Sequence, residues 1–318
     1  MNRSKLPLLT AFILIVLGLV ILCASAAAMH FDMRKLNTAQ IETNTFEIGD
    51  AFDSLSIRGT TEDILLTPSQ DGKCTVICRE DTDMPHTAGV MNGTLTITAE
   101  EKHRIAFGLR LIKGPQITIC LPESSYNELF IDSDTSDVRI PGDFTFEKMS
   151  VTLKTGDADV AADVKTKATL RTSTGRISLH DMQAGEITLS TSTGKTRAEN
   201  VICSGTLDTT VSTGETEMTG VSCADLISSG STGDLELKNV TASGSFRIKR
   251  STGDVEFDAC DAEEIEVETS TGDVSGHLLS AKLFSTKTET GDVDVPASGE
   301  GGKCRIVTET GDIEIRIP

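Results

Sequence analysis

The sequence predicts an all-β protein, a parallel β-solenoid (β-helix) with about 19 to 20 residues per coil, preceded by one N-terminal transmembrane helix. Three observations predict this fold: a Thr-Gly pair recurs at nearly constant spacing, short apolar alternations flank each pair, and a long apolar run opens the chain. A constant period is typical of stacked repeats in which each period forms one coil. The recurring glycines are Gly156, Gly175, Gly194, Gly214, Gly233, Gly253, Gly272, Gly291 and Gly311.

Apolar and polar residues alternate on both sides of each recurring glycine. Around Gly253 the apolar positions are Phe246, Ile248, Val255 and Phe257. A period of two predicts two short strands per coil that share one interior, with the glycine at the corner between them. Because a corner often needs a positive φ or leaves no room for a Cβ, we interpret these glycines as structural corner residues.

The first residues of the chain predict insertion into a membrane. Two basic residues precede an apolar run over 6–29, which is longer than the apolar region of a cleaved signal peptide. We therefore predict a cytoplasmic tip at 1–5, a transmembrane signal anchor at 6–29 and a stalk at 30–45. The bulk of the chain is then extracytoplasmic, on a single-pass protein of the cell membrane. The small residues at 24–28 leave cleavage as the alternative.

Residues 46–120 contain strand-like segments with turn residues between them, but they lack the regular period. We interpret them as an irregular N-terminal β region or cap that covers the first coil of a repeat β-solenoid over 121–318. A separate small β domain is the alternative. Within this region, the Asn92-Gly93 pair predicts a β-hairpin.

The order of short motifs gives a further indication. The segment Ile117–Pro122 is followed by strand-like residues at Leu129 and Ile131 and then by the Thr-Gly-Asp-Val repeats. In this order the motifs resemble an uncharacterised bacterial family of exported β-strand-repeat proteins that are labelled "putative adhesins". The resemblance covers about residues 46–318 and implies a surface-exposed solenoid, with no catalytic residues to carry over.

Composition narrows the set of partners. The net charge of −19 disfavours a nucleic acid, because phosphate groups repel an acidic protein. The chain has no Trp and one Tyr, so it lacks the usual stacking platforms for sugars and bases. We expect no nucleic-acid partner, and instead a cell-envelope component or a membrane protein.

Charged residues are segregated along the repeats. A mostly acidic column directly follows the corner glycines in the later coils, and its members are weak candidates for a weakly bound divalent cation: Asp234, Asp254, Asp273, Asp292 and Asp312. A solvated face that keeps the protein soluble is the alternative. Earlier coils contain a basic group that could bind an anionic envelope polymer: Lys165, Lys167, Arg171, Arg176, Lys195 and Arg197.

Two other residue types recur in step with the corners. Cys203 and Cys223 each follow their corner glycine by nine residues, so we expect them to be stacked in adjacent coils, either as reduced thiols or as a disulfide. Thr-x-Thr pairs such as Thr172 and Thr174 share the phase of the inward apolar residues. They predict a buried or corner threonine ladder rather than an ice-binding face.

No motif indicates catalysis. The five histidines are scattered without metal-ligand spacing. The corner aspartates belong to the repeat, whereas a catalytic pair should depart from it, so we expect no enzyme, no catalytic residues and no cofactor beyond a weakly bound cation. The function hypothesis is a membrane-anchored surface binding or scaffolding module, adhesin-like. The alternatives are an accessory or sensor subunit of a membrane complex that responds to the cell envelope, and a polysaccharide-active β-helix enzyme.

Overall fold

The computed structural model describes residues 15, 17, 18, 41–100, 114–297 and 300–318. Most of these residues belong to strands or to the short turns between them. The predicted cytoplasmic tip, almost all of the predicted anchor and most of the predicted stalk lie outside the described residues. Among the residues that are described, no helix is both long and apolar enough to cross a membrane.

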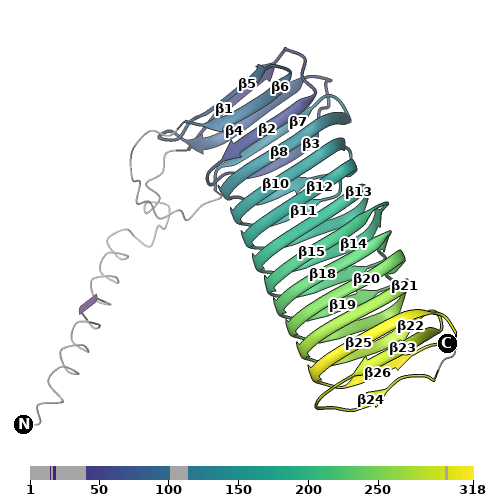
Figure 1. Cartoon of the computed structure of the whole chain (residues 1–318). Helices are drawn as coiled ribbons and strands as arrows, with labels where there is room; N and C mark the ends of the chain where they lie inside the picture. The colour runs from purple at the N-terminus through teal and green to yellow at the C-terminus, as the bar shows by residue number, and fades with distance from the viewer. Residues whose placement is uncertain (1–14, 16, 19–40, 101–113, 298–299) are drawn as a thin grey trace, which may run out of the picture.

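The strands wind into a parallel β-solenoid, which Figure 1 shows as a long rod of stacked coils. The predicted all-β solenoid is therefore confirmed. Each coil contributes a strand before its corner and a strand after it, so the rod has a pre-corner layer and a post-corner layer. The pre-corner layer contains β8 (Ser125–Thr135), β10 (Thr145–Thr155), β12 (Asp163–Thr174), the end of β13 (Ile177–Thr193), β15 (Thr206–Thr213), β18 (Asp225–Thr232), β20 (Thr241–Thr252) and the end of β21 (Val255–Thr271).

The post-corner layer is built from shorter strands. In β13 and β21 the chain continues from this layer into the next pre-corner strand without a break. A two-residue strand, β17 (Ser222–Cys223), pairs with parts of β14 and β20. The remaining members of the layer are β9 (Val138–Ile140), β11 (Ala158–Val160), β14 (Thr196–Cys203), β16 (Thr216–Thr219), β19 (Leu235–Lys238) and β22 (Val274–Leu278).

Parallel register places equivalent residues of successive coils over one another. Ile131 pairs with Val151, and Val151 pairs with Leu170, which are steps of 20 and 19 residues. All three side chains are fully buried, and the same alternation fills the interior of the rod with apolar side chains. Each coil thus covers apolar surface of its neighbours, and this burial favours stacking of the coils.

A second turn lies six residues after several of the corner glycines. The residues there have φ values of 52° to 64°, in the left-handed region: Asp181, Asn200, Gly220, Asn239 and Ala259. Asp, Asn and Gly tolerate this conformation better than other residues. Ala259 has no such preference, so its φ of 55° indicates local backbone strain.

The N-terminal cap consists of strands from residues 41–121. One side is an antiparallel set in which β4 (Cys74–Asp81) lies between β1 (Ile41–Ile48) and β7 (Gln116–Leu121). On the other side β5 (His86–Met91) and β6 (Thr94–Ala99) form the hairpin that Asn92-Gly93 predicts. The coil of β2 (Ser54–Gly59) and β3 (Asp63–Pro68) lies between these strands and the first regular coil, β8 and β9. The cap is therefore continuous with the solenoid.

Strand β1 begins at Ile41, inside the segment that the sequence predicts as a stalk over 30–45. Its alternation is hard to see because Asn44, one of its partly buried residues, is polar. Nδ2 of Asn44 donates a hydrogen bond to Oε1 of Glu80 on β4 at 2.7 Å. This polar contact takes the place of an apolar one, and Phe46 and Ile48 then pack against the core.

The coils at the C-terminal end are not stacked in sequence order. The last coil, β25 (Gly302–Thr310) and β26 (Ile313–Arg316), pairs directly with β21 and β22. Within the described part of the chain, the preceding coil, β23 (Lys282–Lys287) and β24 (Val293–Asp294), pairs only with that last coil, and Figure 1 shows it at the end of the rod. The inward residues of the inserted coil, Ile306 and Ile313, are buried. In the end coil their partners are Thr286, which is polar, and Val293, which is 45% exposed.

Candidate functional site

The corner glycines adopt a conformation that other residues rarely reach. Their φ values lie between 124° and 150°. A Cβ at any of them would lie only 1.7 to 2.2 Å from a carbonyl oxygen of the neighbouring coil. In most cases that carbonyl belongs to the corner glycine of that coil. Both the backbone conformation and the close approach of two coils therefore require glycine here. This applies to all nine glycines that the sequence singles out.

The corner aspartates join successive coils through their side chains. Oδ1 of Asp234 accepts a hydrogen bond from the backbone N–H of Asp254 at 2.9 Å, and Oδ1 of Asp254 accepts one from Asp273 at 2.8 Å. The row continues through Asp312 to Asp292, at 2.8 Å in each step. One oxygen of most of these carboxylates is thus engaged by the backbone, which gives the Gly-Asp motif a structural role that the sequence alone does not show. The cation site stays a prediction.

The threonines before the corner divide into two groups. Thr172, Thr191 and Thr308 are buried, and each Oγ1 donates to the carbonyl of the corner glycine in the neighbouring coil at 3.2 to 3.4 Å. The prediction of a buried ladder is right for these positions. Thr174 and its equivalents stack at the corner, as the corner ladder predicts, but the inward phase is wrong for them, because the two residues directly before the corner both face outward as the backbone turns. The exposed column pairs in register: Thr135, Thr155, Thr174, Thr193, Thr213, Thr232, Thr252, Thr271, Thr310 and Thr290.

Two acidic columns run side by side on the outer side of the post-corner layer. The first is the corner row described above, and the second lies two residues further along each strand. The members of the second column pair in register from Glu217 through Glu236, Glu256, Ser275 and Glu314 to Asp294. Among the described residues, neither Glu236 nor Glu256 has a basic group within 4.0 Å, so this part of the surface is strongly negative.

The predicted basic group is less available than the sequence suggests. Lys167 and Arg171 lie on the pre-corner layer, whereas Arg176, Lys195 and Arg197 lie on or directly before post-corner strands. Five of the six form ion pairs with neighbouring carboxylates: Lys165 with Glu147, Lys167 with Glu186, Arg176 with Asp157, Lys195 with Glu215 and Glu217, and Arg197 with Glu199. These pairs lower the net positive charge that an anionic polymer would meet.

Cys203 and Cys223 lie in adjacent coils, and both are buried and free. Sγ of Cys203 donates to the carbonyl of Gly185 at 3.4 Å, and Sγ of Cys223 points to the carbonyl of Thr241 at 3.8 Å. Burial, with a smaller contribution from Cys203, raises the pKa of Cys223 to about 12. These cysteines are therefore buried thiols with low reactivity.

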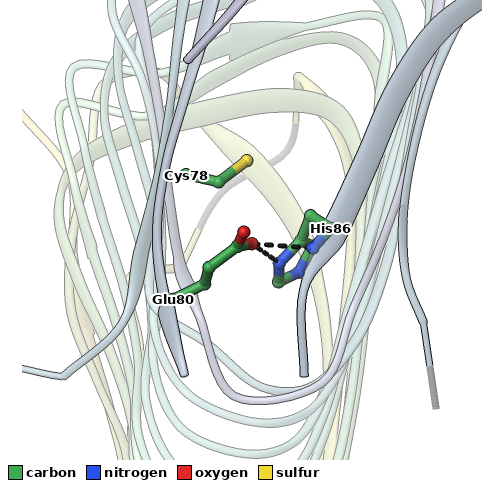
Figure 2. A group of neighbouring side chains, drawn as sticks. All are labelled: Cys78, Glu80 and His86. Atoms are coloured by element: carbon green, nitrogen blue, oxygen red, sulfur yellow. Dashed lines mark hydrogen bonds and ion pairs between the residues drawn. The ribbon is translucent and has the colours of Figure 1, made fainter. Parts of the chain in front are cut away.

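The structure also contains a buried polar cluster in the cap, formed by Glu62, Cys78, Glu80 and His86. Their exposed fractions are 2%, 0%, 0% and 3%. Cys78 and Glu80 alternate inward on β4, and His86 begins β5, while Glu62 lies in the turn before β3. Figure 2 shows Glu80 and His86 pointing toward one another, with Cys78 beside them.

His86 lies between two carboxylates. Its Nδ1 is 2.5 Å from Oε2 of Glu80, which also accepts the backbone N–H of His86 at 2.7 Å. Its Nε2 is 3.5 Å from Oε2 of Glu62, an ion-pair distance rather than a close hydrogen bond. Oε2 of Glu62 in turn accepts the backbone N–H groups of Thr60 and Thr61, both at 2.9 Å. Glu62, Glu80 and His86 are therefore each held in place by a neighbour.

The pKa values in this cluster reflect burial in competition with charge. Burial alone raises the pKa of Glu62, but His86 and the N–H groups of Thr60 and Thr61 lower it to about 2. Burial likewise lowers the pKa of His86, and the two carboxylates more than reverse this, so the pKa is raised. Burial, together with Glu80 and Glu62, raises the pKa of the Cys78 thiol to about 12.

Sequence reasoning missed this cluster because its members come from three separate segments. Cys78 and Glu80 are two residues apart on a strand that also has Cys74 and Val76 in phase, so the pattern indicates an apolar core. Glu80 was the signal: a carboxylate at an inward position of a buried strand requires a partner. His86 could be placed beside it only once the pairing of the cap strands was known.

The fold and the repeated corner define a parallel β-solenoid protein whose coils are joined by Gly, Asp and Thr at one edge. The sequence matches the Toastrack DUF4097 family over residues 52–219 and 204–318, so the chain belongs to this family. None of the curated proteins matches the sequence.

Several crystal structures are similar to this chain. A "putative adhesin" from Bacteroides fragilis is 16% identical, with a TM-score of 0.36, and the match covers 87% of this chain and 97% of that one. A "putative adhesin" from Parabacteroides distasonis is 10% identical, with a TM-score of 0.43 and coverage of 87% and 98%. A "putative lipid binding protein" from the same species is 13% identical, with a TM-score of 0.36 and coverage of 88% and 98%. The expected resemblance is confirmed in this sense: the chain belongs to the family named above, and proteins labelled "putative adhesin" are among those to which it is similar.

Proposed function

We propose that this chain is a membrane-anchored, extracytoplasmic binding or scaffolding module of the cell surface, whose contact face is the acidic part of the post-corner layer. The observation that carries the proposal is the pair of acidic columns that run in register to the end of the rod. Carboxylates on neighbouring parallel strands are about 4.8 Å apart and repel one another. A cationic partner or a bound cation relieves this repulsion, so the face favours partners with repeated positive groups.

Membrane anchoring rests on the sequence of the first residues. The apolar run over 6–29 is long enough to cross a bilayer, and the basic residues before it favour a cytoplasmic N-terminus. The acidic face then lies outside the cell membrane. Intact-mass measurement of the protein from its own membrane tests this directly: a retained N-terminus supports the anchor, and a mass that begins near Ala27 or Met29 contradicts it.

The alternative of a polysaccharide-active enzyme gains no support from the shape of the post-corner layer. A shallow depression of about 440 Å³ near the cap is lined by Asp63, Asp137, Asp157, Asp159 and Arg139 among others. Oδ1 atoms of the first three accept backbone N–H groups, and Asp159 pairs with Arg139. The first three carboxylates therefore continue the row of hydrogen bonds that joins the corner aspartates, so they belong to the repeat rather than to the separate catalytic pair that glycoside hydrolysis uses.

The test compares two double variants of the full-length chain, purified in a mild detergent. Glu236→Gln with Glu256→Gln removes two carboxylates from the acidic face. Glu128→Gln with Glu264→Gln removes two exposed carboxylates from the pre-corner layer and serves as the matched control. We expect the first variant to bind isolated cell envelopes several-fold more weakly than the unchanged chain, and the control to bind normally. Equal binding by both variants contradicts the proposal.

The same experiment separates a wall ligand from a membrane partner. Envelopes stripped of their wall polymer retain binding only if the partner is a membrane protein, which is the accessory or sensor alternative. Chemical cross-linking of the full-length chain in the intact membrane then identifies that protein. Binding that depends on the wall polymer supports the surface-binding function.

A further inference from the structure

We propose that Cys78, Glu80 and His86 bind one zinc ion inside the N-terminal cap. The three side chains are buried, and one ligand atom from each lies within 4.8 Å of the others. They come from β4 and β5, on opposite sides of the cap interior, so an ion at this point would connect the antiparallel set to the hairpin. This site is independent of the acidic face that we propose for binding.

The donor set fits zinc. A thiolate, an imidazole nitrogen and a carboxylate oxygen are the three ligand types that zinc takes from proteins. The thiolate disfavours calcium and magnesium, which prefer oxygen ligands only. Three side-chain ligands leave the fourth tetrahedral position to a water molecule.

The groups around these ligands are arranged as they are around metal ions. A histidine that binds a metal through one ring nitrogen usually donates the other N–H to a carboxylate. Glu62 is in that position, 3.5 Å from Nε2 of His86, and is itself fixed by two backbone N–H groups. The other carboxylate oxygen of Glu80, Oε1, accepts a hydrogen bond from Nδ2 of Asn44 at 2.7 Å. Of the three proposed ligands, Glu80 and His86 therefore each have an orienting partner outside the coordination sphere.

Charge balance is compatible with a divalent cation. When zinc binds, two protons leave, one from Nδ1 of the charged His86 imidazole and one from the Cys78 thiol. The two charges of the ion therefore replace those of the two protons, and the net charge of the buried cluster does not change. Oε2 of Glu80 and Nδ1, now 2.5 Å apart, must separate to about 3.3 Å, the distance between two ligands at about 2 Å from a tetrahedral ion.

The experiment uses the full-length chain, purified in a mild detergent, stripped with a chelator and titrated with Co²⁺ as a spectroscopic probe. We expect one Co²⁺ per chain, with the near-ultraviolet absorption of a thiolate–cobalt bond, and displacement of that absorption by Zn²⁺. Cys78→Ser should abolish the absorption, and Glu62→Gln should weaken binding about 10- to 100-fold, because it removes an orienting partner but no ligand. Cys304→Ser, which alters a buried cysteine at the other end of the rod, should leave the absorption and the binding affinity unchanged.

Zinc-edge X-ray absorption of the unchanged chain needs no variant, so it decides the question even if Cys78→Ser does not fold. One sulfur at about 2.3 Å with nitrogen and oxygen ligands supports the site. Absorption that survives in folded Cys78→Ser, or a zinc environment without sulfur, overturns the proposal and indicates an adventitious surface ion. Failure of the Co²⁺ titration leaves envelope binding by the acidic face unaffected, so the two proposals fail separately.

Discussion

The backbone N–H of Asp312 donates a hydrogen bond to Oδ1 of Asp273 at 2.8 Å, although 39 residues separate them. The last coil therefore lies between two coils that are consecutive in the sequence, and β23 and β24 contact the rest of the rod mainly through it. Truncation after residue 297 should thus remove the order of β23 and β24 as well. We expect the amide hydrogens of 282–294 to lose protection in hydrogen exchange, while those of β20 stay protected.

Stacking in sequence order predicts a different result. The truncated chain would then end in an intact coil formed by β23 and β24, and only the new edge would exchange faster. Protected amides at Phe284 and Thr286 in the truncated protein would therefore contradict the inserted position of the last coil.

Gly253 illustrates how the corner limits substitution. Its φ is 138°, and a Cβ would lie 2.2 Å from the carbonyl oxygen of Gly233. Gly253→Val should therefore destabilise the protein by about 3 to 5 kcal/mol, through backbone strain and a clash with a neighbouring coil. Glu256→Gln, three residues further at an exposed position, should change the free energy of unfolding by less than about 0.5 kcal/mol. Chemical denaturation of both variants measures the difference, and similar effects would mean that the corner is not under strain.

The period of 19 to 20 residues and the apolar alternation were enough to predict the solenoid and its corners. Each coil repeats the same corner glycine and the same apolar alternation, so a correct prediction of one coil applies to the others. The second turn was also visible in principle, because Asp181, Asn200, Gly220 and Asn239 are residues that favour positive φ. The sequence could not reveal the insertion of the last coil, because equivalent positions in all coils carry similar residues and many stacking orders satisfy the same pattern.

The buried cluster of the cap was beyond prediction for a different reason. Glu62, Glu80 and His86 meet only because of pairings between strands that are distant in the sequence: β4 pairs with β1 and β7, and the β5–β6 hairpin pairs with β2. Nothing repeats in this region, so no period relates one segment to another. Sequence patterns locate polar residues on strands, but the partners of an irregular sheet are set by tertiary packing.

Ala259 offers a substitution that should stabilise the protein. It has a φ of 55°, where a residue with a Cβ is unfavourable by about 1 to 2 kcal/mol. Ala259→Gly removes the Cβ and should raise the free energy of unfolding by about 0.5 to 1 kcal/mol, after the extra flexibility of glycine in the unfolded chain is counted. Ala262→Gly, on the same strand β21 but with ordinary backbone and a buried side chain, should lower it by a similar amount. Thermal unfolding of both variants tests this opposite sign, and destabilisation by both would contradict the strain at Ala259.

Thr172 and Thr174 test the two threonine environments. Thr172 is 4% exposed and donates to the carbonyl of Gly156 at 3.2 Å, whereas Thr174 is exposed. Valine is accepted at the buried position, since Val211 occupies it in a later coil. Thr172→Val should therefore lose about 1 kcal/mol of stability from one hydrogen bond, and Thr174→Val should change it little. Denaturant unfolding with an unchanged m-value measures both, and equal losses would show that the Oγ1 contact contributes nothing.

The acidic columns predict a response to salt. Repulsion between stacked carboxylates destabilises the distal coils at low ionic strength, and screening reduces it. Sodium chloride should therefore raise the thermal unfolding temperature of the full-length chain. If Asp234, Asp254, Asp273, Asp292 and Asp312 hold a weakly bound divalent cation, calcium chloride at matched ionic strength should raise it further, by about 2 °C or more.

A substitution in the corner row distinguishes cation binding from screening by salt. In most coils Oδ1 of the corner aspartate already accepts a backbone N–H, so a cation can bind only through the second carboxylate oxygen. Asp254→Asn retains a carbonyl oxygen that can accept the backbone hydrogen bond of Asp273, yet it removes a charge from the middle of the column. It should therefore reduce the extra stabilisation by calcium and leave the effect of sodium almost unchanged. Glu264→Gln on the pre-corner layer is the control and should alter neither. Equal stabilisation of the unchanged chain by calcium and sodium would leave only a solvated face that responds to ionic strength.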